Sequence, residues 1–126
     1  MFRAMKVEPD GLPKVGRSSR ELGVRLDGPT IDISVGEDGT VEPETGGMSV
    51  ALDAARNLPK PRLPRSLGGE GRDPVFTMFK ADIPKNLLVR PDRPKHALVE
   101  PIRRCPLADF ESALTSTRPF WSKTHD

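Results

Sequence analysis

Proline and glycine, spread along the whole chain, restrict the fold more than any other feature of the sequence. There are 14 prolines and 11 glycines among 126 residues, about a fifth of the chain. Proline removes a backbone donor and clashes inside a helix, and glycine costs a helix about 1 kcal/mol relative to alanine. A helical bundle, a coiled coil and any long uninterrupted helix are therefore excluded. The length predicts a single domain over residues 1–126, with one modest core.

Short strands are the elements that such a chain can form. Alternating or β-branched runs bounded by turn residues predict strands at 1–7, 24–26, 31–35, 48–51, 74–79 and 95–102. Helical turns are expected at 19–22, 52–56 and 83–88. The best helix follows Pro106, where Leu107, Phe110 and Leu114 recur at helical spacing. The fold class predicted from these segments is α+β, mostly antiparallel, with core positions at Phe76, Phe79 and Phe110 and a packing role for Trp121.

Charge and cysteine content exclude several functional classes. Twenty basic and 18 acidic residues give a net charge of +2, which does not indicate nucleic-acid binding by itself. Cys105 is alone and only two histidines are present, so we expect no intrachain disulfide and no metal site. No run of about 18 apolar residues and no signal-peptide pattern occur, so we expect a soluble protein without membrane contact.

Basic residues cluster locally despite the balanced total. Only Glu70 opposes five cations in the segment 56–72, which overlaps a loop of proline and glycine at 59–73; the cations are Arg56, Lys60, Arg62, Arg65 and Arg72. A second cluster is opposed only by Asp92, and its members are Lys85, Arg90, Arg93 and Lys95. Such loops usually hydrate a surface; otherwise they attract a polyanion or a phosphorylated cofactor.

Three features carry possible chemistry when they are taken together. Arg3 lies on the first strand, and an arginine can bind a pyrophosphate through two parallel hydrogen bonds. Gly46 and Gly47 precede Ser49 at the start of a middle strand, where glycines allow a close approach to the backbone. Glu100 ends a late strand, and a carboxylate there can bind a ribose hydroxyl and stabilise an oxocarbenium-like centre. Each of these residues also has an ordinary structural explanation, and His96 is expected to be structural.

The residues around these features resemble a known family. The stretches are Phe2-Arg3-Ala4, the segment VEPETGGMSV at 41–50, and HALVEP at 96–101. They are similar to the Tse-type toxin family of ADP-ribosyltransferase-like domains, named for a toxin exported by a bacterial type VI secretion system. Similar domains occur at the C-termini of Rhs polymorphic toxins, where ribosomal RNA is the target named for one branch. The similarity runs over most of residues 1–121, and the TGG-x-SV segment is its specific part.

The resemblance implies a fold and a set of roles. The fold would be a split antiparallel β-sandwich with a few short helices, holding NAD as substrate in the cleft. Arg3 would bind the NAD phosphates, Gly46 and Gly47 would line the nicotinamide ribose with Ser49, and Glu100 would be the catalytic carboxylate that Ser49 helps to place. Many of these transferases have a second Glu or Gln two residues before the catalytic Glu, and Leu98 stands there instead. This departure favours a nucleic-acid or unusual acceptor, or a degenerate site.

The implied function is that of an antibacterial mono-ADP-ribosyltransferase, a glycosyltransferase by reaction. It would be secreted and would act as a monomer in the target-cell cytoplasm on RNA or protein, with a cognate immunity protein as partner. One alternative is an NAD glycohydrolase with water as acceptor. Another is a non-enzymatic RNA- or protein-binding module that uses the basic loops; its affinity would fall steeply with salt.

Overall fold

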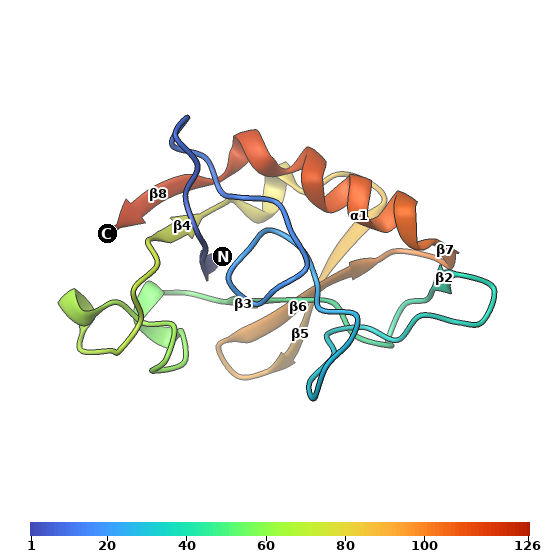
Figure 1. Ribbon diagram of the computed structural model, residues 1–126, viewed down its shortest axis with the longest axis horizontal. Coiled ribbons are helices and arrows are strands. Elements are labelled where there is room, and N and C mark those ends of the chain that lie inside the picture. Colours follow the sequence, from blue (N-terminus) through green and yellow to red (C-terminus); the bar gives the residue numbers. More distant parts are fainter.

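The computed structural model describes residues 1–126 and is built around one antiparallel sheet of six strands (Figure 1). The strand order is β5-β6-β3-β1-β4-β8. Their bounds are β1 Phe2–Ala4, β3 Met48–Ala51, β4 Val75–Thr77, β5 Leu87–Arg93, β6 His96–Pro101 and β8 Ser122–His125. A separate two-stranded ribbon pairs β2 Thr40–Val41 with β7 Cys105–Pro106. This arrangement confirms the expected α+β class with mostly antiparallel strands.

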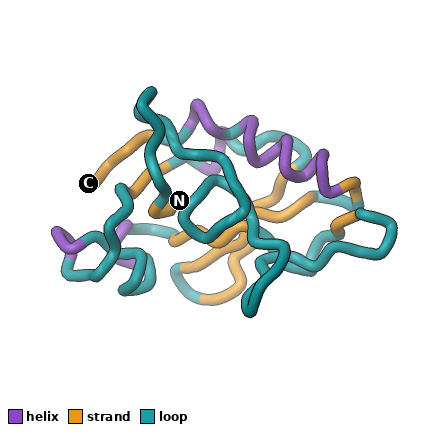
Figure 2. Tube along the Cα trace, in the orientation of Figure 1, coloured by secondary structure: helices purple, strands orange, loops and turns teal.

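One α-helix accompanies the sheet. The helix α1 spans Leu107–Ser116, directly after Pro106, as the sequence predicted. Four short 3-10 helices complete the regular structure, at Ala55–Asn57, Arg65–Leu67, Lys80–Asp82 and Arg118–Phe120. Residues 5–39 form no helix or named strand, and Figure 2 draws this long segment as loop. No helix here has the length and apolar character that crossing a membrane requires.

Two hydrophobic cores lie on opposite faces of the sheet. The larger has 17 buried residues and packs the apolar stripe of α1, with Phe110 and Leu114, against the sheet. The smaller has six, which are Ala4, Ala51, Ala55, Leu58, Leu63 and Val75. Val50 belongs to the first core and its neighbour Ala51 to the second. Because successive strand residues point to opposite faces, this division places Leu58 and Leu63 of the segment 56–72, the basic loop, on the face away from α1.

The predicted helical turn at 83–88 is wrong. Pro84 follows the short 3-10 helix Lys80–Asp82, and the chain from Leu87 onward is the strand β5. It pairs with β6 along a register from Leu87 opposite Pro101 to Arg93 opposite His96, with an irregularity between Pro91 and Arg93. Proline inside this strand concealed it in the sequence, but β5 is an edge strand, where a missing donor is tolerated.

Other predicted elements shift or shrink. The expected strands at 24–26 and 31–35 reduce to a single bridge between Ile33 and Gly46, and the expected turn at 19–22 is not helical. The edge strand β8 was not predicted; it pairs with β4 through Thr77 and Ser122, so partner geometry rather than local pattern defines it. The strand predicted at 48–51 is confirmed with the same bounds, and those predicted around Phe2, Val75 and His96 are confirmed in shortened form.

The burial predicted for the aromatic residues is confirmed at three positions and wrong at one. Phe76, Phe110 and Trp121 are buried, with at most 2% of each exposed, as expected. Phe79 is 78% exposed, so its predicted core position is wrong. The strand β4 ends at Thr77 and the chain turns into a 3-10 helix after Phe79, so the alternation that placed Phe79 with the core no longer applies.

These two phenylalanines give a matched test of the packing. Phe110→Ala removes a ring that is 1% exposed, so we expect the free energy of unfolding to fall by about 3–5 kcal/mol. Phe79→Ala should change it by no more than about 0.5 kcal/mol. Urea denaturation of both variants checks this, and equal losses would contradict the core described here.

Candidate functional site

Arg3 is a buried cation held by backbone carbonyls. The residue is 6% exposed. Its Nη1 donates to the carbonyl of Ser49 at 2.7 Å, and its Nε and Nη2 donate to the carbonyl of Glu21 at 3.1 and 2.9 Å. Nη2 also contacts the carbonyls of Ser18 and Gly23, both at 3.3 Å. Of the five N–H donors of a guanidinium, only one, on Nη1, is left without a protein partner.

This arginine lies where the sheet opens. The strands β1 and β3 share one paired position, Phe2 opposite Ala51. Beyond it the Arg3 side chain, rather than a strand backbone, bonds the carbonyl of Ser49. The side chain thereby joins β1 to β3 and to the loop around residues 18–23, which is connected to neither strand by a ladder. The hydrogen bonds of Arg3 therefore hold β1, β3 and this loop together at the opening.

Arg3 remains charged despite its burial. Loss of hydration is the main influence on its pKa and lowers it, the nearby Asp32 carboxylate raises it, and Arg62 and Arg25 lower it further. The result is a pKa of about 10. At neutral pH the guanidinium is thus protonated, and it places a fixed positive charge at the opening of the sheet.

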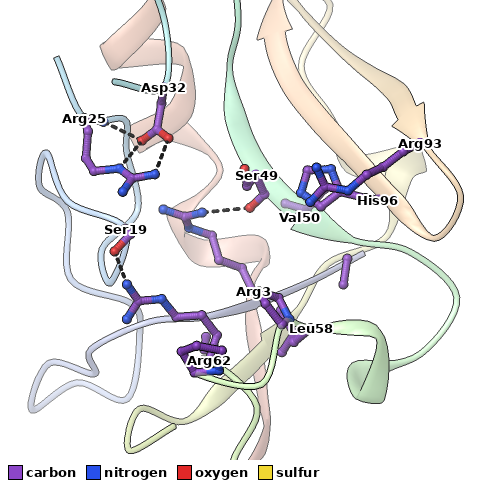
Figure 3. A pocket seen from close by; sticks show the side chains of 14 residues that line it. Arg3, Ser19, Arg25, Asp32, Ser49, Val50, Leu58, Arg62, Arg93 and His96 are labelled. Carbon is purple, nitrogen blue, oxygen red and sulfur yellow. Dashed lines mark hydrogen bonds and ion pairs between the residues drawn. The ribbon is translucent and has the colours of Figure 1, made fainter. Parts of the chain in front are cut away.

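A cavity of about 310 Å³ lies at this opening (Figure 3). Its charged lining consists of the four arginines Arg3, Arg25, Arg62 and Arg93 and the single carboxylate of Asp32. Arg25 binds that carboxylate through its backbone N–H, Nε and Nη2 at 2.7, 3.2 and 2.8 Å. Three arginines therefore lack a neutralising partner in the cavity, which suits a ligand that carries phosphate groups.

Ser49 lies on the cavity wall, and its neighbours across the sheet follow from the strand register. Ser49 is opposite Leu98 in the pairing of β3 with β6. Alternation places His96, Leu98 and Glu100 on the face of the sheet that Ser49 occupies. His96 and Glu100 are thus the two diagonal neighbours of Ser49 on the adjacent strand. The Cα atom of each lies roughly 7–8 Å from the Cα atom of Ser49. The structure brings Ser49 and Glu100 onto one face, as the proposed site needs.

Glu100 is buried beside this cavity without lining it. The residue is 1% exposed, and its carboxylate accepts three hydrogen bonds from Arg90, at 2.9–3.0 Å, and one from the backbone N–H of Glu44 at 3.3 Å. Arg90 keeps about a third of its side chain exposed. The carboxylate is therefore covered by a side chain that has access to solvent.

Gly46 and Gly47 bring the protein backbone into close contact with itself. Gly46 has a φ of +123°, and a Cβ there would lie 2.0 Å from the carbonyl oxygen of Asp32. A Cβ on Gly47 would lie 2.4 Å from the carbonyl oxygen of Val99 and 3.3 Å from the Cα of Glu100. The close approach that the sequence predicted is thus made by other backbone segments of the same chain, and neither glycine lines the cavity.

Several residues of the cavity could not be identified as functional from the sequence. The ion pair of Arg25 with Asp32 joins positions seven apart in a segment that has no regular structure, so no periodic signal marks it. Arg62 was visible only as one of five cations in the basic loop. His96 was expected to be structural, yet it lines the cavity.

The hydrogen bonds of Arg3 lead to a stability prediction. Arg3→Lys keeps the charge but cannot reach four carbonyls from one planar group, so we expect the free energy of unfolding to fall by about 3 kcal/mol. Arg17→Lys is the matched control, because Arg17 is 61% exposed and bonds only Glu111; it should cost at most about 1 kcal/mol. Thermal or urea unfolding gives both values. Equal effects would show that the carbonyl cluster does not hold the opening.

Comparison with known proteins places the chain in a family. A family model described as the Tse2 ADP-ribosyltransferase toxin matches residues 1–121. No curated protein and no solved structure matched the chain. The matched range includes the opening of the sheet, the cavity around Arg3 and the late strand with Glu100. On this match, the chain belongs to the Tse2 ADP-ribosyltransferase toxin family.

Proposed function

We propose that this toxin transfers one ADP-ribose unit from NAD to RNA or protein in the cytoplasm of a bacterial target cell. It would act as a monomeric type VI or Rhs-type effector that a cognate immunity protein neutralises. The observation that supports the proposal is the arginine-lined cavity at the opening of the sheet, in a chain of an ADP-ribosyltransferase toxin family. We take the opening between β1 and β3 as the counterpart of the split in the sandwich that the family resemblance implies.

The proposed position of NAD follows from the charges. The pyrophosphate would lie near Arg3, Arg62 and Arg93, the arginines of the cavity without a carboxylate partner. Arg3 would contribute its positive charge and its one free N–H, since its other donors hold the carbonyls. The nicotinamide ribose would extend along Ser49 toward Gly46 and Gly47. These glycines have no side chain, which lets neighbouring backbone segments pack closely against them.

Glu100 is the proposed catalytic carboxylate. The ribose would displace Arg90 and bind the carboxylate through a hydroxyl, with Ser49 at the diagonal position helping to orient it. As the glycosidic C–N bond breaks, nicotinamide leaves with the bonding electrons, and the carboxylate stabilises the positive charge on the ribose. The acceptor's nucleophile then forms the new bond to the anomeric carbon and loses its proton.

The basic loop is the proposed acceptor-facing element. A second cavity of about 340 Å³ shares Pro61 and Arg62 with the first. No hydrophobic side chain lines it. Its lining includes four arginines, which are Arg20, Arg62, Arg65 and Arg72. Arg20 is held by Asp73 at 2.6 and 2.8 Å, which leaves the other cations available. An anionic acceptor, such as ribosomal RNA, would bind beside the NAD phosphates.

Incubation of the protein with NAD labelled in its adenylate half and a bacterial lysate tests this proposal. We expect label on a macromolecule, and nuclease or protease treatment then distinguishes RNA from protein as acceptor. Consumption of NAD with free ADP-ribose as the only labelled product would instead identify a glycohydrolase. Intact NAD together with salt-sensitive RNA binding would identify a non-enzymatic binding module.

Substitution of Glu100 tests the catalytic assignment. Glu100→Gln keeps the shape of the side chain but removes its charge, so we expect transfer to fall by roughly 100-fold or more. Glu111→Gln is the control, because Glu111 also bonds an arginine through both oxygens but lies on α1, outside the cavity. Unfolding curves verify that both variants fold. Wild-type transfer rates in Glu100→Gln would move the catalytic role to another residue.

A further inference from the structure

His96 lies on the wall of the cavity with its ring held by a carboxylate. It begins β6, and its side chain is 13% exposed. The Nδ1 atom lies 2.6 Å from Oδ1 of Asp92, on the neighbouring strand β5. Figure 3 shows the His96 ring next to Arg93, its partner in the pairing of β5 with β6. The ring is thus fixed in orientation at a site where a ligand would contact it.

The partner of Nδ1 determines which ring nitrogen is available. Burial raises the pKa of Asp92, but the hydrogen bond and the charge of His96 outweigh it and leave the pKa below its ordinary value. An ionised carboxylate only accepts hydrogen bonds, so Nδ1 carries a proton and donates it. The neutral imidazole then has its lone pair on Nε2, the form in which a histidine accepts a proton.

No other group in the cavity is as well suited to accept a proton. The remaining charged residues that face it are Arg3 from β1, Arg25 and Asp32 from the loop before β2, Arg62 from the basic loop and Arg93 from β5. Arginines are protonated at neutral pH and cannot act as bases. The Asp32 carboxylate is occupied by three hydrogen bonds from Arg25. His96 is therefore the one side chain of the cavity poised to remove a proton.

The register places His96 on the far side of Ser49 from Glu100. Both residues belong to β6 and point to the same face, separated by four residues, or about 13 Å at ~3.3 Å per residue. A ribose bound by Glu100 beside Ser49 would then have His96 on the side away from Glu100. An acceptor hydroxyl attacking from that side comes within hydrogen-bonding reach of Nε2.

We propose that His96 is the general base of the transfer reaction and that Asp92 is the residue that positions it. The acceptor is then one with a protonated nucleophile, in chemical class a hydroxyl. Its oxygen forms the bond to the anomeric carbon, its proton moves to Nε2, and nicotinamide departs with the electrons of the broken C–N bond. The imidazolium afterwards releases the proton to solvent. This role rests on the proposed function, because it requires NAD to be cleaved in this cavity.

Nicotinamide release from NAD, measured with lysate as the source of acceptor, tests the proposal in His96→Gln and His96→Ala. We expect kcat to fall by roughly 100-fold or more in both variants, with little change in KM for NAD. The rate of the wild type should increase with pH, because only the neutral imidazole accepts a proton, and the variants should lack that increase. Added imidazole should restore part of the rate in His96→Ala, where it can occupy the vacated space, and none in Glu100→Gln.

Controls separate this role from a structural one. His125→Asn changes the other histidine, which lies at the C-terminal end of β8 outside the cavity, and should behave as wild type. His96→Gln keeps an amide donor for Asp92, so the β5–β6 hairpin should persist even if His96→Ala unfolds. A rate loss that imidazole does not rescue, with the pH dependence retained, would overturn the proposal, and so would wild-type kcat in both variants. No nicotinamide release by the wild type would overturn the proposed function and this role together.

Discussion

The buried guanidinium of Arg3 is the interaction on which the site depends. A charge that is 6% exposed is costly unless it is fully hydrogen-bonded, and here four carbonyls from the loop around residues 18–23 and from β3 provide the partners. In return, Arg3 joins two parts of the chain that share no strand ladder. Together with the burial of Leu22, Val24 and Ile33 in the larger core, this gives the irregular segment 5–39 a defined position against the sheet.

That arrangement also determines the electrostatics of the cavity. Arg3 is fixed at its base, Arg62 and Arg93 reach it from the basic loop and the β5–β6 hairpin, and the single carboxylate present is already bound to Arg25. The buried acid and the candidate base lie on one strand, β6, as Glu100 and His96. A phosphate-bearing substrate would thus be attracted by groups from loops, while the chemistry would be performed by groups on the sheet, which is the more rigid support.

The sequence pattern correctly predicted those elements whose structure is determined by their own residues. The alternation around Met48 and His96 and the apolar spacing from Leu107 to Leu114 located two inner strands and the helix correctly. The edge strands β5 and β8 depend on a partner strand, and the one proline inside β5, Pro91, concealed that strand in the sequence. Sequence could propose Arg3, Ser49 and Glu100 together, and the fold places Ser49 and Glu100 on one face. The sequence could not reveal that Arg3 bonds carbonyls, because that contact joins residues far apart in the chain. Nor could it reveal that Arg90 covers Glu100, because Arg90 lies on a strand that was not predicted.

The proposed reaction depends above all on NAD binding at the opening of the sheet next to Arg3. Titration of NAD into isotopically labelled protein, followed by backbone amide NMR shifts, tests it most directly because it needs neither an acceptor nor turnover. We expect saturable shifts at a set of residues around the opening and none on the helix α1; the residues are Ser19, Gly47, Ser49, Arg62 and His96. Shifts confined to other surfaces, or no shifts at millimolar NAD, would contradict it.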